Sequence, residues 1–403
     1  MVEMKDIESL FSELEENYKY LHQCPELGFE EQETSAYIMK KLAEYGIQGK
    51  QVARTGVIAT IEGGRPGKSV AIRADMDALP VVEASGVSYA SKKDGFMHAC
   101  GHDSHVAMLL AAAHYLQEHR SEMKGRVRLI FQPAEEGFRP ETYAAAVAEG
   151  CDPKGGAASM IKYGALEGVD ACFALHINSS LPLGTLGVPK ERFSASSDVF
   201  ELTIQGKGGH GSAPEEAIDP MGALAAVIAA YNAYPSREVG ALDSCSLSIG
   251  MVKAGTVWNA IADSAYITGG LRTFSNEMRD HTFQRLEEIA NGICAAHRCT
   301  AKFSRKEGYA PGICDRAMSE VMQKVGRAVL GEENVSVQEQ PMMGSEDVGY
   351  YFQKVPGVIG WLGGMPVDGN PIPQHNPRFM IDLKSLRYGT LFHINMALEL
   401  LNE

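Results

Sequence analysis

The densest group of chemically capable residues is the run HACGHDSH, residues 98–105, which holds three of the twelve histidines. Cys100 and His102 stand two residues apart, and thiolate and imidazole are donors that Zn²⁺ and similar ions prefer. We therefore predict a metal site here, with chance clustering as the alternative. His98 and His105 are expected to support the site from outside the set of ligands.

A pair of acids precedes this run in the segment RADMDALP. Asp75 and Asp77 are two residues apart, so in an extended segment their side chains face the same side. They could bind a metal, or they could hold a metal-bound histidine through its other ring nitrogen. A turn or helix-capping pair is the alternative.

A second pair of acids, Glu135 and Glu136, lies in the segment QPAEEG directly after the apolar run VRLIF. Adjacent acids usually mean a solvated surface. At the end of a buried strand, one can bind a metal while the other takes a proton from metal-bound water. The spacing alone does not indicate which glutamate has which role.

Two isolated histidines complete the candidate ligands. His176 ends the apolar run ACFALHI, and His375 lies in a proline-rich loop beyond another apolar run. A lone histidine is more often structural, but both follow strand patterns as the other segments do. Three protein ligands serve one catalytic zinc, and the whole set would serve two ions that share a ligand.

The elements that must position these residues alternate between helix and strand patterns. The predicted strands are 69–74, 127–131, 171–177 and 358–362, and the predicted helices are 33–45 and 102–123. This alternation indicates an α/β layer with a mostly parallel sheet. In such sheets ligands bind beyond the carboxyl ends of the strands, which is where the four segments fall.

The pattern changes near residue 197. Strand and helix patterns then follow in the order β-α-β-β-α-β, which is that of a ferredoxin-like unit. We therefore predict a catalytic domain of residues 1–190 and 311–403. A ferredoxin-like α+β domain of residues 191–310, inserted into it, would serve as a lid or dimerisation domain.

Composition excludes several classes of protein. The chain has 403 residues and a formal net charge of −14, which disfavours binding to nucleic acid or to anionic membranes. It carries neither a signal-peptide pattern nor a run of about 18 apolar residues that could span a membrane. Its eight cysteines are expected to be reduced thiols, and the protein to be cytoplasmic.

These motifs together resemble one family. RADMDALP, HACGHDSH, QPAEEG, ALHI, GKGGHGSAP, NAIAD, LRTF, GSED and QHNP occur in the order found in the dinuclear-metal aminoacylase and carboxypeptidase family, peptidase family M-twenty. The resemblance covers nearly the whole chain. It is strongest to the branch of hippurate hydrolases, indoleacetyl-amino-acid hydrolases and N-acyl amino acid amidohydrolases.

The resemblance implies a role for each candidate residue. One or two divalent ions (Zn²⁺, Mn²⁺ or Co²⁺) would be held by Cys100, His102, Glu136, His176 and His375. Glu135 matches the general base, and Asp77 matches the acid that orients a ligand. In the inserted domain His210 resembles the residue that polarises the scissile carbonyl, often across a dimer. Asn259 resembles a substrate contact, and Arg272 a carboxylate clamp.

We accordingly expect a homodimeric amidohydrolase that cleaves N-acyl amino acids. Alternatives are a dipeptidase or aminobenzoyl-glutamate hydrolase of the same family, and a non-catalytic metal- or ligand-binding relative. Two departures from the branch bear on the substrate. Pro214 is followed by Glu215 where the branch usually has histidine, and residues 138–153 (FRPETYAAAVAEGCDP) look like extra sequence beside the metal site.

Overall fold

A computed structural model describes residues 1–367 and 369–402 of the protein. The chain divides into two compact units. The first comprises Met1–Phe193, Ile313–Gln340 and Asp347–Glu403, and the second Ser194–Gly312 and Pro341–Glu346. The domain predicted from sequence spans 191–310, so the short segment Pro341–Glu346 is an addition that the sequence patterns did not indicate.

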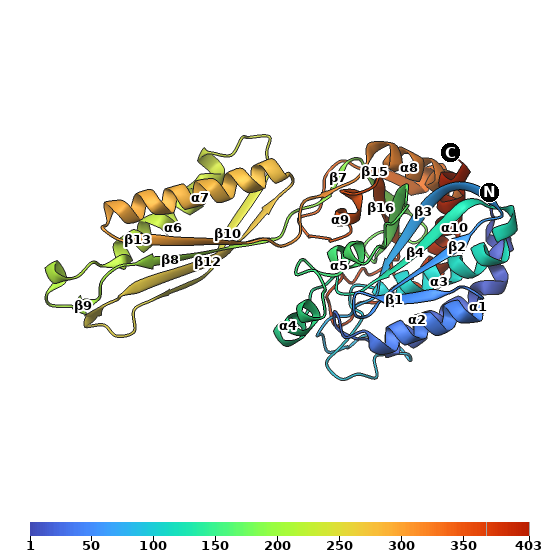
Figure 1. The fold of residues 1–403 in the computed structure, drawn as a ribbon, viewed down its shortest axis with the longest axis horizontal. Helices are drawn as coiled ribbons and strands as arrows, with labels where there is room; N and C mark the ends of the chain where they lie inside the picture. Colours follow the sequence, from blue (N-terminus) through green and yellow to red (C-terminus); the bar gives the residue numbers. More distant parts are fainter. Residues whose placement is uncertain (368, 403) are drawn as a thin grey trace. The chain divides into compact units, whose positions relative to one another are not determined.

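The first unit is built on an eight-stranded sheet with the strand order β1-β2-β4-β3-β5-β16-β6-β15 (Figure 1). Its strands are β1 (Gly49–Val52), β2 (Gly56–Glu62), β3 (Arg65–Asp75), β4 (Lys124–Gln132), β5 (Ala171–Asn178), β6 (Leu186–Pro189), β15 (Val335–Gln338) and β16 (Gly357–Gly363).

The centre of this sheet is parallel. The pairings β4–β3, β3–β5 and β5–β16 are parallel, as is β6–β15, whereas β1–β2, β2–β4 and β16–β6 are antiparallel. Strands buried on both faces need continuous apolar runs. The buried runs in β3, β4, β5 and β16 meet that need. The prediction of an α/β fold with a mostly parallel sheet is confirmed.

The first unit also contains helices and short 3₁₀ turns, several of which pack on this sheet. They are η1 (Met4–Leu10), α1 (Phe11–Gln23), α2 (Gln32–Glu44), α3 (His102–Glu118), η2 (Arg120–Glu122), α4 (Pro140–Ala148), α5 (Gly156–Lys162), α8 (Arg316–Leu330), η4 (Glu332–Asn334), α9 (Gly349–Phe352) and α10 (Lys384–Asn402). Helix α3 packs against α10 and β3. The helix predicted over 102–123 ends at Glu118, and a separate 3₁₀ turn follows.

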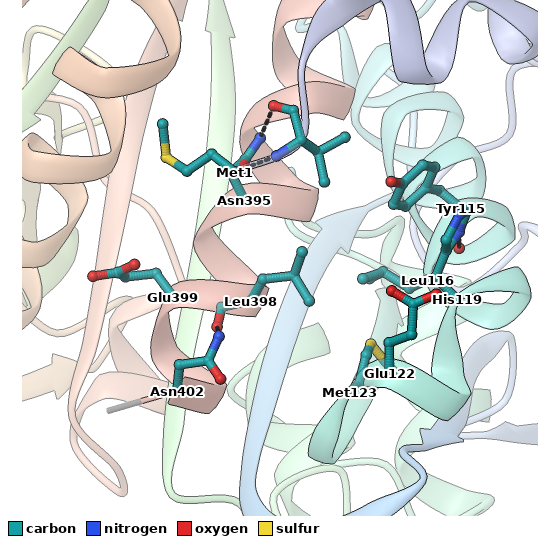
Figure 2. A pocket seen from close by; sticks show the side chains of 11 residues that line it. Met1, Tyr115, Leu116, His119, Glu122, Met123, Asn395, Leu398, Glu399 and Asn402 are labelled. Carbon is teal, nitrogen blue, oxygen red and sulfur yellow. Dashed lines mark hydrogen bonds between the residues drawn. The ribbon is translucent and has the colours of Figure 1, made fainter.

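The first residues of the chain are tied to the last helix. The Val2 N–H donates to Oδ1 of Asn395 at 2.9 Å, and Nδ2 of Asn395 donates to the Val2 carbonyl at 3.1 Å. Figure 2 shows the pocket beside this junction, of about 360 Å³, between the C-terminal end of α3 and α10. None of the candidate site residues lines it.

The second unit contains the predicted ferredoxin-like order of elements. They are β8 (Asp198–Gln205), β9 (Gly209–His210), η3 (Pro214–Glu216), α6 (Pro220–Arg237), β10 (Cys245–Ala254), β11 (Ala260–Ile261), β12 (Ser264–Thr273), α7 (Asn276–Ala296) and β13 (Thr300–Lys306). The main sheet has the order β10-β12-β8-β13, and its pairings are antiparallel. Strands β7 (Arg192–Ser194) and β14 (Gly312–Ile313) lie where the chain passes between units.

The core of this unit is formed by every second residue of its strands. Phe200, Leu202 and Ile204 of β8 are buried, and so are alternate residues of β12. They pack with residues of α6 and α7 that include Tyr231 and Leu286, and these two helices lie side by side along the sheet (Figure 1). Among the described residues of the whole chain, no helix is long and apolar enough to cross a membrane.

Candidate metal centre and active site

The carboxyl ends of the central parallel strands gather the candidate residues of the first unit. Asp77 follows the end of β3, Glu135 and Glu136 follow β4, and His176 lies near the end of β5, in parallel register with Trp361 of β16. His375 lies in the loop after β16. Topology thus collects residues that lie up to 298 positions apart in the sequence, counted from Asp77 to His375.

A glycine turn sets the first two donors. Gly101 has φ 89° and caps the start of α3, placing Cys100 in the preceding loop and His102 at the first helical position. A Cβ at Gly101 would lie 2.4 Å from the Cγ2 of Ile177. Both the left-handed backbone and the lack of space therefore require glycine between the two donors.

His102 is oriented by a carboxylate. Its Nδ1 lies 3.2 Å from Oδ1 of Asp77, so Nε2 is the nitrogen left for a ligand. That Nε2 is buried and makes no hydrogen bond to any described residue. Histidine ligands of metals commonly have this arrangement, with a carboxylate on the second nitrogen.

The loop that carries Glu135 and Glu136 is held in place by a hydrogen bond to the buried side chain of Glu31. Ala134 has φ 52°, an uncommon conformation for a residue with a Cβ, and its N–H donates to Oε1 of Glu31 at 2.9 Å. Oε2 of Glu31 accepts from Oγ1 of Thr55 at 2.5 Å. Burial raises the pKa of Glu31 to about 8. This buried contact stabilises a strained turn at the position where the two acids are presented.

The two isolated histidines also face this cluster. Nδ1 of His176 lies 2.7 Å from the Ile177 carbonyl, which leaves Nε2 at 3.5 Å from Sγ of Cys100. Nε2 of His375 lies 3.1 Å from Oε1 of Glu136. The His375 backbone has φ 66°, and its N–H donates to the Ala99 carbonyl at 2.8 Å.

Potential donor atoms of the described residues form several overlapping groups, and two of these groups contain Cys100. Donors of Cys100, His102 and His176 lie within 4.8 Å of one another, and so do those of Cys100, Glu136 and His375. Thiolate, imidazole and carboxylate in such groups suit zinc and similar divalent ions. Together with Nε2 of His102, which makes no hydrogen bond to a described residue, these residues have the donor chemistry that would hold divalent ions.

The electrostatics of the cluster also favour a cation. Burial opposes a charge on His102, yet Asp75, Asp77 and Glu136 raise its pKa to about 10. Burial, with the carboxylates of Glu136 and Glu135, holds the pKa of the Cys100 thiol well above its usual range. The electrostatic potential at the cluster is therefore strongly negative. A divalent ion held there would offset this negative charge and favour the thiolate form of Cys100.

A buried ion-pair network lies behind the cluster. Arg73 is 1% exposed, and its guanidinium donates to Asp75 at 2.5 Å, to Asp347 at 3.0 Å and to Gln132 at 2.9 Å. Asp347 also accepts from Nε2 of Gln132 at 2.8 Å and from a helix N–H of α5. The network joins the ends of β3 and β4 to the chain that precedes α9.

Sequence reasoning missed this network, although one signal was available. Arg73 is a charge inside the apolar strand pattern SVAIRA, and a buried guanidinium needs carboxylate partners. His105 belongs to the same support. Its Nδ1 contacts Asp75 at 2.5 Å and its Nε2 accepts from the Ile177 N–H at 2.8 Å, so both ring nitrogens are engaged.

The other candidates belong to the second unit. His210 pairs with Ala260 across the β9–β11 ribbon, next to Asn259, whose carbonyl accepts from the Gly211 N–H at 2.9 Å. Both side chains are exposed. Arg272 lies on β12, half-buried, and its Nη1 donates to the Met343 carbonyl at 3.1 Å.

Known proteins resemble this chain over almost its whole length. The model of Peptidase family M20/M25/M40 matches residues 71–399. An IAA-amino acid hydrolase of Arabidopsis thaliana (ILR1-like 2) is 39% identical over 95% of this chain and 84% of its own length. The N-acetylcysteine deacetylase of Bacillus subtilis is 38% identical over 94% of each chain.

A solved structure shares the fold as well. The YXEP protein of Bacillus subtilis, described as a dinuclear metal-binding peptidase of the M20 family, matches with a TM-score of 0.82 at 34% identity. The match covers 98% of this chain and 99% of that one. A fold and site of this kind define a metal-dependent hydrolase. The protein belongs to peptidase family M20/M25/M40, a family of amidohydrolases and peptidases.

Proposed function

We propose that the enzyme hydrolyses the amide bond of N-acyl amino acids, with Glu135 as the general base. Cys100, His102, Glu136, His176 and His375 would hold two divalent ions. The observation that carries this proposal is the pair of three-residue donor groups that share Cys100, with the Glu135 carboxylate beside them. Oε2 of Glu135 lies 3.9 Å from Nε2 of His102.

Each residue of the cluster has a distinct task in this proposal. The ions, when bound, would lower the pKa of water and polarise the carbonyl. Glu135 takes a proton from the attacking water and returns it to the leaving amine. Asp77 keeps His102 in the tautomer that leaves Nε2 available. The near-complete burial of Glu135, at 6% exposed, limits competition from bulk water for its carboxylate.

The second unit would supply contacts to the substrate. A guanidinium can pair with a carboxylate through two parallel hydrogen bonds, which suits Arg272 to the amino-acid end. His210 would stabilise the developing oxyanion, and removal of one such donor typically costs about 3–4 kcal/mol. The backbone N–H of Ser212 donates to Nδ1 of His210 at 3.2 Å, so in the neutral ring Nε2 carries the proton and is the donor.

A substrate panel with metal-stripped protein tests the proposal. N-acetyl, N-benzoyl and longer-acyl amino acids are offered with and without Zn²⁺, Mn²⁺ or Co²⁺. Cleavage that returns with metal is the expected result. Stoichiometric metal binding without cleavage of any substrate would instead support a non-catalytic binding protein.

Short peptides form the second arm of the panel. Thermostable carboxypeptidase 2 of Saccharolobus solfataricus is 35% identical over 100% of this chain and 98% of its own length. That likeness favours peptides as the alternative substrate class. Faster turnover of dipeptides than of any N-acyl amino acid would move the assignment to a peptidase.

Assembly and location complete the proposal. We expect a homodimer, because β10 lies at the edge of its sheet and exposes Met251 and Val252, each 44% exposed. Light scattering should give a molar mass of twice 43.6 kDa.

We propose that the enzyme is cytoplasmic, since all eight cysteines are free thiols. Fractionation of cells that make the protein tests this.

A further inference from the structure

A small pocket opens beside the candidate metal ligands in the first unit. Its volume is about 160 Å³, and it is lined by Leu27, Gly28, Ala78, Leu79, Pro80, Glu136, Gly137, Phe138 and Arg139. Glu136 is one of the proposed ligands, so a molecule whose reacting carbonyl sits at the metal centre can extend a substituent into this pocket. Neither the motifs nor the comparisons assign it a role.

The extra segment of residues 138–153 builds one wall of the pocket. Phe138 stacks on Tyr143 of α4 with ring centroids 5.1 Å apart, and it packs on Phe29 at 5.5 Å. Phe29, Ala146 and Cys151 form a small buried cluster behind it. The ring of Phe138 is therefore held by aromatic contacts on two sides rather than left as a loose loop residue.

Two of the lining residues, Gly28 and Gly137, come from loops that approach each other closely. A Cβ at Gly28 would lie 1.9 Å from the Gly137 carbonyl oxygen, so the backbone of residues 27–28 touches that of the acid-bearing loop. No side chain larger than hydrogen fits between them.

Charge selects the kind of group that fits. The lining includes the apolar side chains of Leu27, Leu79 and Phe138. The cation Arg139 is already paired, since its Nε donates to Glu30 at 3.0 Å and its Nη2 to the other oxygen of that carboxylate. A substrate carboxylate in the pocket would be repelled by the carboxylate of Glu136, and Arg139, the cation of the lining, is already paired with Glu30. An uncharged apolar group avoids that repulsion.

We propose that this pocket is the acyl subsite and that it takes a compact apolar acyl group of about the size of a single ring. The inference rests on the proposed function, because it assumes an N-acyl amino acid at the metal centre. An apolar cavity of about 150 Å³ accommodates benzene, which sets the scale. A benzoyl group fills the pocket, an acetyl group leaves most of it empty, and an octanoyl chain exceeds it.

The test compares acyl groups on one amino acid. The ratio of kcat/KM values is measured for N-benzoyl, N-acetyl and N-octanoyl derivatives with metal-loaded enzyme. A difference of one methylene in a hydrophobic pocket is worth about 10–200-fold in kcat/KM. We expect Phe138→Trp, which takes volume from the pocket, to lower the benzoyl-to-acetyl ratio about 10-fold. Phe138→Ala, which opens the wall, should raise the octanoyl-to-benzoyl ratio about 10-fold.

Val147→Ala is the matched control, because Val147 lies on the same helix α4, is 38% exposed and does not line the pocket. It should leave both ratios unchanged. If the wild type cleaves the N-acyl series but neither Phe138 variant moves a ratio, the subsite assignment is wrong and the proposed function stands. If the wild type cleaves no N-acyl amino acid, the proposed function fails and the assignment fails with it.

Discussion

One carboxylate, that of Asp77, links His102 to the loop that carries Glu135 and Glu136. Oδ1 of Asp77 lies 3.2 Å from Nδ1 of His102, while Oδ2 accepts from the Glu136 N–H at 2.8 Å. The side chain is 1% exposed. A single residue thus sets both the tautomer of one proposed ligand and the position of another.

Replacement of Asp77 should therefore affect metal and rate together. Asp77→Asn keeps the shape but lets an amide nitrogen face either His102 or the Glu136 N–H. Loss of a partner of this kind typically costs 10–100-fold in metal affinity or activity. Metal titration and kcat measured on the same preparation test this. Full retention of both values would show that the carboxylate charge is unimportant.

Substitutions of Glu135 and Glu136 should have different effects on metal content and on kcat. Glu135→Gln should bind metal at the wild-type ratio but lose at least about 100-fold in kcat, the lower end of the usual contribution of a general base. Glu136→Gln should reduce the metal content, because its oxygen lies in the group with Cys100 and His375. Elemental analysis and kcat distinguish the two. Retained turnover in Glu135→Gln would remove it from the role of base.

Cys100→Ala should lower the metal-to-protein ratio towards one or below, because both donor groups contain this thiol. Cys172→Ala is the matched control. Cys172 is a buried thiol in β5, and burial raises its pKa to about 12. It lies outside both groups, so the ratio should stay as in the wild type. Equal metal content in the two variants would exclude Cys100 from the centre.

Arg272→Ala should raise KM for substrates with a free carboxylate by about 10-fold or more, since charge-assisted pairs are worth about 1.5–3 kcal/mol. The corresponding amides of the same substrates are the control, because they lack the charge. The measurement is KM for each acid and amide pair. An equal loss on both would indicate a structural role through the contact with Met343.

The pH dependence of stability should reveal the charge on a buried histidine, His22, that is not one of the proposed metal ligands. Nδ1 of His22 contacts Asp103 at 2.6 Å and Nε2 contacts Glu83 at 3.2 Å. Burial would lower the pKa of His22, but these carboxylates raise it from 6.5 to about 9. The folded pKa exceeds the unfolded one, so the stabilisation is complete below pH 6.5 and is lost as pH rises through 9.

Urea unfolding of metal-free wild type and His22→Asn, from pH 6 to pH 10, measures this effect. The difference in free energy of unfolding between the two should shrink by about 3 kcal/mol across that range. A difference that stays constant with pH would mean that His22 is neutral in the folded protein and contributes by packing alone.

The sequence predicted those features that depend on local periodicity and on motif order. Apolar runs identified β3, β4, β5 and β16, and the rule that ligands lie at carboxyl ends of parallel strands explained why HACGHD and QPAEE belong together. The change of pattern near residue 197 indicated the ferredoxin-like unit. These inferences succeed because a buried strand needs a continuous apolar run whatever its partners are.

Features that depend on long-range partners could not be read in this way. Nothing local to Asp347 says that it pairs with Arg73, which lies 274 positions away. The helix α4 in the extra segment and its stacking of Tyr143 on Phe138 are likewise tertiary outcomes. Which aspartate holds His102 also depends on the turn at the end of β3, since Asp75 pairs with Arg73 and His105 instead.

The order of the chain has a consequence for biosynthesis. Strand β5, which carries His176, pairs with β16, and His375 follows only after the whole second unit has been made. At about 5–20 residues per second, roughly 10–40 s separate the synthesis of His176 from that of His375. During that interval the nascent polypeptide exposes a thiol and imidazoles that would capture stray cations. If His375 is a ligand as we propose, the metal centre can be completed only after translation of the C-terminal segment, and a truncated message would yield a product that lacks one proposed ligand.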